Sequence, residues 1–366
     1  MKRNALLLLA AMLATPAAAQ DATLAAPRLH EEAISTVLEK AVDGFIRPGY
    51  RNFRDHADAL GTSMETLCSA PSQQNLDAAK AAFGATVTAW SHIEIVRIGP
   101  VIEDNRFERI LFYPDRKSTG LKQVQAVLAK PDETATNVDT LKDKSVAMQG
   151  LGALEFVLYG TGSEVLATEK GGFRCRYGTA IAGNLERLGG ELVDIWDKPD
   201  GIQDAWKHPG PDNPVFRDGR EAITALLGIL VHGAEAVRDQ RLETFYKGEA
   251  NNTFPKQAIY WRSQNTFKSV ADNIDGIRAL LDSSDMVELL NEDVRSTVSS
   301  INFVAKSLER VAMDINPDVE VAVGDPVQRA KLDFLLLNSR DLILRLNNDY
   351  GGAIGLGAGF SFSDGD

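Results

Sequence analysis

The stretch MQGLGALEFVLYG, residues 148–160, places one carboxylate inside an apolar helical pattern. Leu151, Leu154 and Leu158 recur at the spacing of one helix face, and Glu155 falls on that same face. A carboxylate on a buried face needs a charged or hydrogen-bonding partner, because burying it unpaired costs free energy. Gly152, one turn before Glu155, leaves space beside it. We therefore expect a polar site on a helix inside the protein.

Apolar residues recur at helical spacing through most of the chain, and no segment alternates as a strand would. The predicted helices cover residues 30–67, 73–96, 118–129, 139–159, 177–196, 217–240, 256–282, 285–313 and 326–347. Proline is concentrated in residues 197–214, which we interpret as a domain boundary. The sequence thus predicts an all-α protein with two helical bundles, residues 28–196 and 215–350, and a Gly-rich tail, residues 351–366. The apolar residues of the tail favour its docking onto the body.

The N-terminus is typical of a secretory signal. Lys2 and Arg3 precede an apolar run, residues 5–14, and small residues follow as far as Ala19. Residues 1–19 are therefore predicted to be a cleaved signal peptide, which in a Gram-negative host makes the protein periplasmic. No later run approaches the roughly 20 apolar residues that span a bilayer, so we expect no membrane insertion after cleavage. The formal net charge of −12 argues against nucleic acid as a partner and permits cations as ligands.

The chain has two cysteines, Cys68 and Cys175. An exported protein meets an oxidising compartment, so a disulfide between them is the expected state. The alternative is a pair of buried free thiols.

The segment WSHIEIVRIGP, residues 90–100, is a second candidate for a polar site. Trp90 shares a helix face with Glu94, and Glu94 shares one with Arg97, which predicts a packed Trp beside a Glu–Arg pair. His92 and Glu94 point apart on a helix and cannot bind one ion together. An ordinary surface ion pair is the alternative for Glu94.

Two further segments carry candidate residues. Residues 103–117, which include Arg109, alternate arginines with acids and predict either an Arg–carboxylate network or a solvated loop. His232 and Glu235 lie three apart on a predicted helix and could share a cation, with Gly228 one turn earlier leaving room. A histidine buried in the core is the alternative. The sequence contains no HExxH, GxSxG or P-loop pattern.

The chain resembles the imelysin-like proteins, exported helical proteins of the imelysin peptidase and iron-regulated group. The resemblance lies in the order of the segments RPGYRNF, WSHIEIVRIGP, DNRFERILFYPDRK, VAMQGLGALEFVLYG, RCRYGTAIAGNLE and GFSFSDGD. The GxHxxE motif of the family aligns on residues 150–155, so Gly150 and Glu155 are kept and Gly152 stands at the His position. Gln149, three residues before Gly152, is then a possible polar substitute for the imidazole.

The resemblance implies a duplicated two-bundle fold with a site between the bundles, around Glu155 and Glu94. It also implies a link to iron uptake, with iron or another divalent or trivalent cation as ligand and other iron-uptake envelope proteins as partners. We therefore expect an iron-linked binding or accessory protein. A metallopeptidase is the first alternative, although Gly152 removes a metal ligand and we lean against an enzyme. The second is a non-catalytic scaffold in which Glu155 only pairs with Arg97 or Arg109.

Overall fold

The computed structural model describes residues 28–359, and within them every regular element is a helix. The only β-type pairing in that range is an isolated antiparallel bridge between Tyr246 and Thr253. The prediction of an all-α protein is confirmed. The predicted signal peptide, residues 1–19, lies outside the described residues, as does the end of the tail, residues 360–366.

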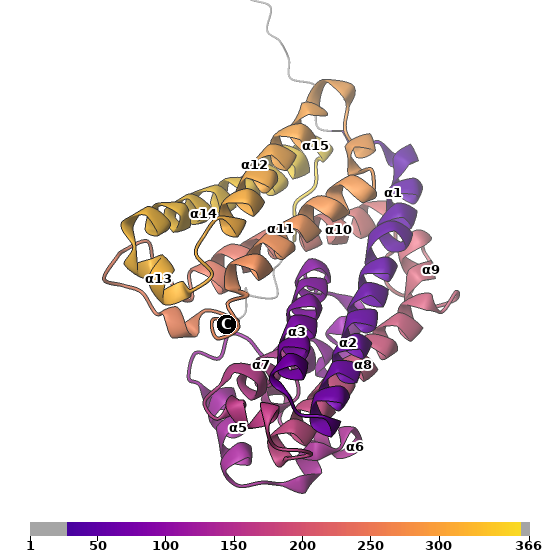
Figure 1. Cartoon of the computed structure of the whole chain (residues 1–366). Coiled ribbons are helices and arrows are strands. Elements are labelled where there is room, and N and C mark those ends of the chain that lie inside the picture. The colour runs from indigo at the N-terminus through magenta and orange to yellow at the C-terminus, as the bar shows by residue number, and fades with distance from the viewer. Residues whose placement is uncertain (1–27, 360–366) are drawn as a thin grey trace, which may run out of the picture.

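The first half is built around one long helix. Helix α1 (Ile34–Lys40) continues through a π-helical segment, Ala41–Ile46, into α2 (Arg47–Ser69), which packs against α3 (Gln73–Ile93) and α8 (Phe173–Asp197) (Figure 1). The buried face of α2 carries Tyr50, Phe53, Ala57, Leu60 and Met64, whose spacing of three and four residues follows the helix period. The shorter helices are α4 (Arg106–Ile110), α5 (Thr119–Ala129), α6 (Val138–Leu141) and α7 (Leu151–Tyr159).

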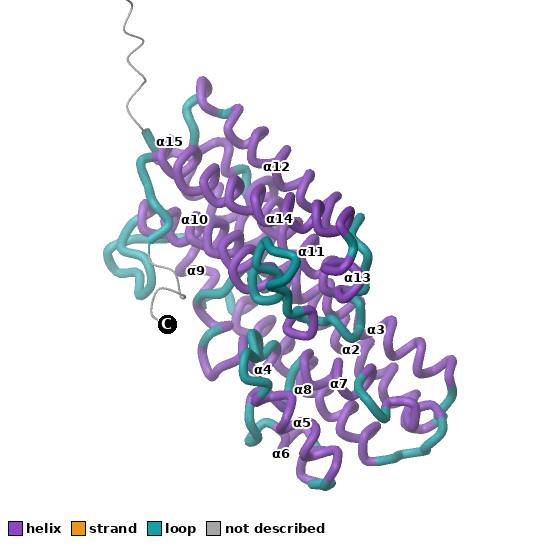
Figure 2. The backbone as a smooth tube through the Cα atoms, turned by 90° about the vertical axis from the view of Figure 1, so that its left-hand side faces the viewer, coloured by secondary structure: helices purple, strands orange, loops and turns teal. Residues whose placement is uncertain are grey.

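The second half consists of helices from the rest of the chain. Helix α10 (Gly219–Glu235) packs on α11 (Thr266–Ser283) and α14 (Pro326–Leu344), and α12 (Ser296–Met313) packs on α11 and α14. The short helices here are α9 (Ile202–Lys207), α13 (Val319–Gly324) and α15 (Gly352–Ile354). Figure 2 shows α10, α11, α12 and α14 together at one end and α2, α3, α7 and α8 at the other.

The two halves share a continuous core. Helix α3 packs against α11, and α1 reaches past the first half to contact α9 and α10. The buried apolar side chains of both halves accordingly form one cluster. The predicted bundle limits, residues 28–196 and 215–350, stay a prediction.

Three predicted helices are shorter than the apolar pattern indicated, and one of them is residues 285–313, where α12 covers only Ser296–Met313. Residues 139–159 do not form one helix, because the chain leaves α6 and α7 begins only at Leu151. Gly150, which precedes α7, is extended, and a Cβ there would lie 2.4 Å from the carbonyl oxygen of Ile110. Residues 256–265 also form a loop, in which Tyr260 and Gln264 have φ of +55° and +59°. These left-handed residues are incompatible with a continuous helix.

Cys68 and Cys175 form a disulfide that ties the end of α2 to the start of α8, as predicted. The tail docks as far as it is described, since Ile354 is buried and Leu356 and Ala358 pack on the core. Among residues 28–359, no helix has an apolar stretch long enough to cross a membrane.

Candidate functional site

A cavity of about 130 Å³ lies between the two halves. One wall comes from α5, α7 and the chain around Leu111–Asp115, and the other from the loop of residues 256–262. Its charged lining residues are Asp115, Glu155, Lys256 and Arg262, and its aromatic ones are Phe112, Tyr113, Phe156, Tyr260 and Trp261. Aliphatic side chains, among them Val124 and Val146, complete the lining. The cavity therefore combines an apolar body with a few charged groups, which is the usual make-up of a small-molecule site.

Glu155 projects from α7 into this cavity and is 4% exposed. The backbone N–H and the hydroxyl of Ser263 both donate to its Oε1, at 2.9 Å each. Burial raises the pKa of the Glu155 carboxyl, and the Ser263 N–H and the charge of Arg262 oppose that rise. The partner of Glu155 is thus Ser263 of the other half. The prediction of a pair with Arg97 or Arg109 is wrong.

The two glycines of the motif have different roles. A Cβ on Gly152 would meet no atom within 4 Å, so the position of the family's histidine opens into the cavity. A Cβ on Gly150 would collide with the carbonyl oxygens of Ile110 and Arg109 at 2.4 and 2.6 Å. Gly150 therefore allows the chain to pass close to the end of α4, and Gly152 gives access to the space beside Glu155.

Residues 256–262 form the opposite wall of the cavity, and hydrogen bonds within the loop of residues 256–265 fix its conformation. Tyr260 is buried at φ +55°. Its carbonyl oxygen accepts from Asn265 N–H at 3.2 Å and lies 3.1 Å from the hydroxyl oxygen of Ser263. Asn265 Nδ2 donates to Ser263 O at 3.3 Å. A bulky residue in the left-handed region is costly and persists only where the surroundings fix it, which is common at functional sites. Ser263 and Arg262 were not predicted as site residues, because apolar residues 258–261 extended the predicted helix through them. The run Ser-Gln-Asn, residues 263–265, is a turn signal that could have indicated the loop.

Glu94 belongs to a separate buried cluster next to the cavity. It directly follows the last residue of α3, and its Oε1 accepts from Arg241 Nη2 and from Asn273 Nδ2 at 2.6 Å each. Trp90 packs against Phe53 with ring centroids 5.0 Å apart. The predicted Glu94–Arg97 pair assumed that the helix continues, but α3 ends at Ile93 and Arg97 pairs with Glu108 at 3.4 Å.

The cluster around Glu94 encloses a second, smaller cavity of about 30 Å³. Glu94 Oε2, Arg241 Nη1 and Asn273 Oδ1 are buried there without a hydrogen-bond partner among the described residues. The volume matches the share of one water molecule in the liquid. Burial lowers the pKa of Arg241, but Glu94 and the tyrosines nearby outweigh burial, with a net rise. Burial and Glu94 raise the pKa of Tyr260, which lies between this cluster and the cavity of Glu155.

His232 and Glu235 pair with each other, Nδ1 to Oε2, at 2.9 Å. His232 lines the small cavity with Glu94, away from the larger cavity of Glu155. The room expected beside Gly228 is filled, because a Cβ there would lie 3.1 Å from the carbonyl oxygen of Ala358 in the tail. His92 pairs with Asp275 at 3.1 Å, so it and Glu94 have different partners.

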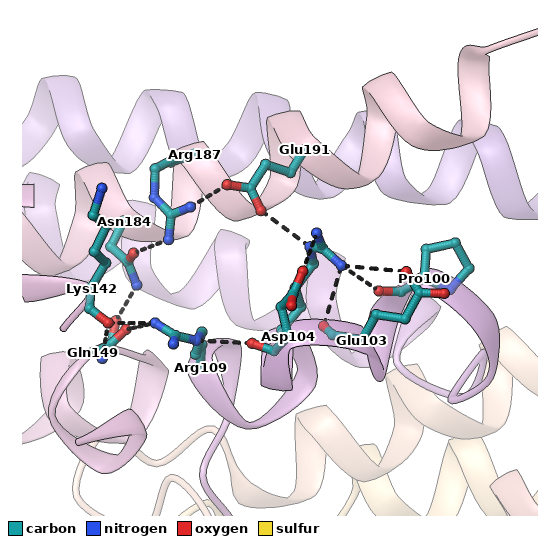
Figure 3. Close-up of polar contacts among 10 residues, drawn as sticks. Pro100, Glu103, Asp104, Arg109, Lys142, Gln149, Asn184, Arg187 and Glu191 are labelled. Atoms are coloured by element: carbon teal, nitrogen blue, oxygen red, sulfur yellow. Dashed lines mark hydrogen bonds and ion pairs between the residues drawn. The ribbon is translucent and has the colours of Figure 1, made fainter. Parts of the chain in front are cut away.

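Gln149 and Arg109 lie in a polar network on another face of the molecule (Figure 3). Arg109 donates to Gln149 Oε1 at 3.1 Å and to the carbonyl oxygen of Asp104 at 3.0 Å. Gln149 Nε2 donates to the carbonyl oxygens of Lys142 and Lys144. The prediction that Gln149 fills the space at Gly152 is wrong, because Gln149 precedes the first residue of α7 and the helical spacing does not apply to it. Gln149 instead anchors the turn before α7.

Arg106 extends this network and makes ion pairs of the kind expected for residues 103–117, whereas Arg109 binds carbonyl and amide oxygens rather than a carboxylate. Arg106 pairs with Glu191 of α8 at 3.1 Å and with Asp104 at 3.0 Å. These contacts hold α4 against α8.

Among residues 28–359, no three His, Cys, Asp or Glu side chains lie close enough to share a metal ion. At the larger cavity the carboxylates are Glu155 and Asp115, both of which already accept hydrogen bonds from the protein, and the charge of Arg262 acts on Glu155. Three protein ligands are usual even for an open catalytic zinc site. The described residues therefore do not fit a metal ion held by protein ligands alone.

Comparisons with known proteins were made on the sequence and on the structure. The family model described as Imelysin, of the M75 peptidases, matches residues 46–345. No curated protein matches the chain. An imelysin-like protein from Psychrobacter arcticum 273-4 has a similar structure, with a TM-score of 0.75 at 15% identity over 92% of this chain and 99% of that one. An iron-regulated protein A precursor from Parabacteroides distasonis ATCC 8503 gives a TM-score of 0.70 at 15% identity, over 90% of this chain and 96% of the other.

Proposed function

Because the chain belongs to the imelysin family, we propose that it is an exported, iron-linked binding protein whose ligand site is the cavity of Glu155 between the two halves. The link to iron is supported by the name of the similar Parabacteroides protein, an iron-regulated protein A precursor. The signal-like layout of residues 1–19 supports a periplasmic location. Other envelope proteins of iron uptake are the partners that such a role requires.

The observation that carries this proposal is the open space at Gly152 beside a buried carboxylate. The cavity is walled by both halves, and Glu155 of one half is held by Ser263 of the other. Burying a carboxylate costs free energy, and here the cost is not offset by closer packing. A larger residue at position 152 would reduce the cavity, but the chain has glycine there. Such an arrangement is typical of a site that is kept for a ligand.

A metallopeptidase is less well supported by the same residues. It would need about three protein ligands, an open coordination position and a general base. Glu155 is the one motif ligand that the chain keeps, and its nearest charged neighbour is Arg262, which opposes a bare cation. Binding rather than metal-dependent hydrolysis is therefore the function we propose.

Titration calorimetry on the purified chain tests the proposal, with ferrous, zinc and cupric ions and ferric citrate as probes. We expect at least one iron form to bind, and Gly152→Leu to abolish that binding by filling the cavity. Glu94→Ala, in the separate small cavity, is the matched control and should leave binding in place once circular dichroism confirms its fold. Binding that survives Gly152→Leu unchanged would refute the assignment of the site.

A further inference from the structure

Arg262 is held at the cavity wall by aromatic rings. Its guanidinium carbon lies 4.4 Å from the ring centroid of Trp261 and 5.2 Å from that of Phe156. Both rings also line the cavity. Stacking on rings fixes the plane of a guanidinium while leaving the N–H groups at its edge free to donate. Among residues 28–359 the one charge acting on Arg262 is that of Glu155, and it acts through space rather than through a side-chain hydrogen bond.

Arg174 gives an internal comparison, because it approaches the same Phe156 ring at 5.7 Å. Its guanidinium is fully used: it donates to the carbonyl oxygens of Val157, Thr161 and Phe156, each at 2.8 Å. Arg174 therefore fastens the end of α7. Arg262 has no such acceptors among the described residues, although it belongs to the same aromatic environment.

The other charged groups of the cavity already have protein partners. Asp115 accepts from the backbone N–H groups of Thr119 and Leu121 at the start of α5, at 2.7 and 3.0 Å. Lys256 lies 3.5 Å from Glu320, and Glu155 accepts from Ser263. Arg262 is thus the charged group of the cavity whose donors remain for a ligand. A planar fork of N–H donors matches two oxygens of a carboxylate or of a phosphate, and the carboxylate is the smaller of the two groups for a cavity of about 130 Å³.

We propose that this cavity binds a small organic carboxylate, whose carboxylate group accepts hydrogen bonds from Arg262 and whose apolar part lies against Val124 and Val146. This inference rests on the proposed function, since it names the ligand of the same site. The cavity, at about 130 Å³, has room for about six non-hydrogen atoms, so a larger acid such as citrate enters with one carboxylate arm while its remainder stays at the mouth of the cavity. Iron then arrives as a carboxylate complex, because Arg262 and Lys256 oppose a bare cation.

The test is a calorimetric titration with succinate, citrate, ferric citrate and, under anaerobic conditions, ferrous sulfate. We expect the carboxylates to bind and ferrous sulfate not to bind. Arg262→Gln should weaken carboxylate binding about 10- to 100-fold, as for the loss of a charge-assisted hydrogen bond. Arg262→Lys, which keeps the charge but loses the fork, should weaken it less. Arg217→Gln removes an exposed arginine paired with Glu221 and should change nothing.

The outcomes separate this inference from the proposed function. Ferrous ion binding that is lost in Gly152→Leu, with no carboxylate binding, keeps the site and overturns its anionic ligand. Carboxylate binding that is unchanged in folded Arg262→Gln overturns the role of Arg262, and binding of no probe overturns the carboxylate as ligand. If citrate binds alone as tightly as with iron, the ligand is the free carboxylate; if only ferric citrate binds, it is the iron complex. Circular dichroism of each variant confirms that it is folded.

Discussion

Replacing each motif glycine by alanine should have opposite effects on stability. Gly152 lies in the first turn of α7, and its Cβ would meet open space. Gly152→Ala should therefore stabilise the protein by about 0.5–1 kcal/mol, because alanine loses less backbone entropy in a helix than glycine does. Gly150→Ala places a Cβ 2.4 Å from the carbonyl oxygen of Ile110, where backbone rather than a flexible side chain must move. We expect it to destabilise the protein by about 1–3 kcal/mol or more.

Urea denaturation followed by circular dichroism measures both changes in the free energy of unfolding. The two variants make the same chemical change two residues apart, so each is the control for the other. Ligand binding gives a second measurement. The added methyl group of Gly152→Ala enters the cavity, whereas that of Gly150→Ala points at the carbonyl oxygens of Ile110 and Arg109. Equal destabilisation by both would refute the reasoning, because it would mean that the space at Gly152 is closed in solution.

Three further predictions concern buried charges and the disulfide. Burial raises the pKa of Glu155 above 4.5, so the folded protein loses stability as the pH rises through that raised pKa. Glu155→Gln should therefore increase the free energy of unfolding in urea by an amount that grows with pH. An increase that does not depend on pH would contradict this. Arg241→Met leaves Glu94 buried without its cation and should lower the free energy of unfolding by about 3–5 kcal/mol. The double variant Glu94→Leu/Arg241→Met should recover most of that loss. An equally unstable double variant would show that the pair itself stabilises the protein. Cys68→Ala/Cys175→Ala removes a cross-link between residues 107 apart and should lower the free energy of unfolding by about 4–5 kcal/mol. If a reductant leaves the thermal unfolding of the wild type unchanged, the bond is not present.

The fold could be predicted from the sequence because long helices carry a long periodic signal. The buried face of α2 repeats over about five turns from Tyr50 to Leu67, and the disulfide was predicted from the signal-like layout of the N-terminus. The errors lie where a few residues decide the path of the chain. Periodicity continued through Gly150, where close backbone contact with α4 ends the regular structure, and through Tyr260, whose left-handed conformation is fixed by contacts from Asn265 and Ser263.

The candidate site was only half visible in the sequence for the same reason. Glu155 and Gly152 stand in a helix, so their shared face could be predicted, and both line the cavity. Ser263 and Arg262 come from a loop more than 100 residues later, and nothing local in the sequence links that loop to α7. The assignment of Gln149 failed because helical spacing was applied to a residue that lies two positions before the helix begins. Contacts between distant segments are what a single sequence leaves open.

The disulfide also fixes the order in which the cavity can be assembled. A chain synthesised from its N-terminus presents Cys68 and Cys175 before it presents residues 256–262. The first half can thus be covalently closed, with Glu155 already in place on α7, while the second wall is still missing. The loop with Ser263 and Arg262 then docks onto a finished surface. A chain that stops before residue 256 would keep its cross-link and lack the second wall of the cavity, so binding at the proposed site would report that synthesis and folding are complete.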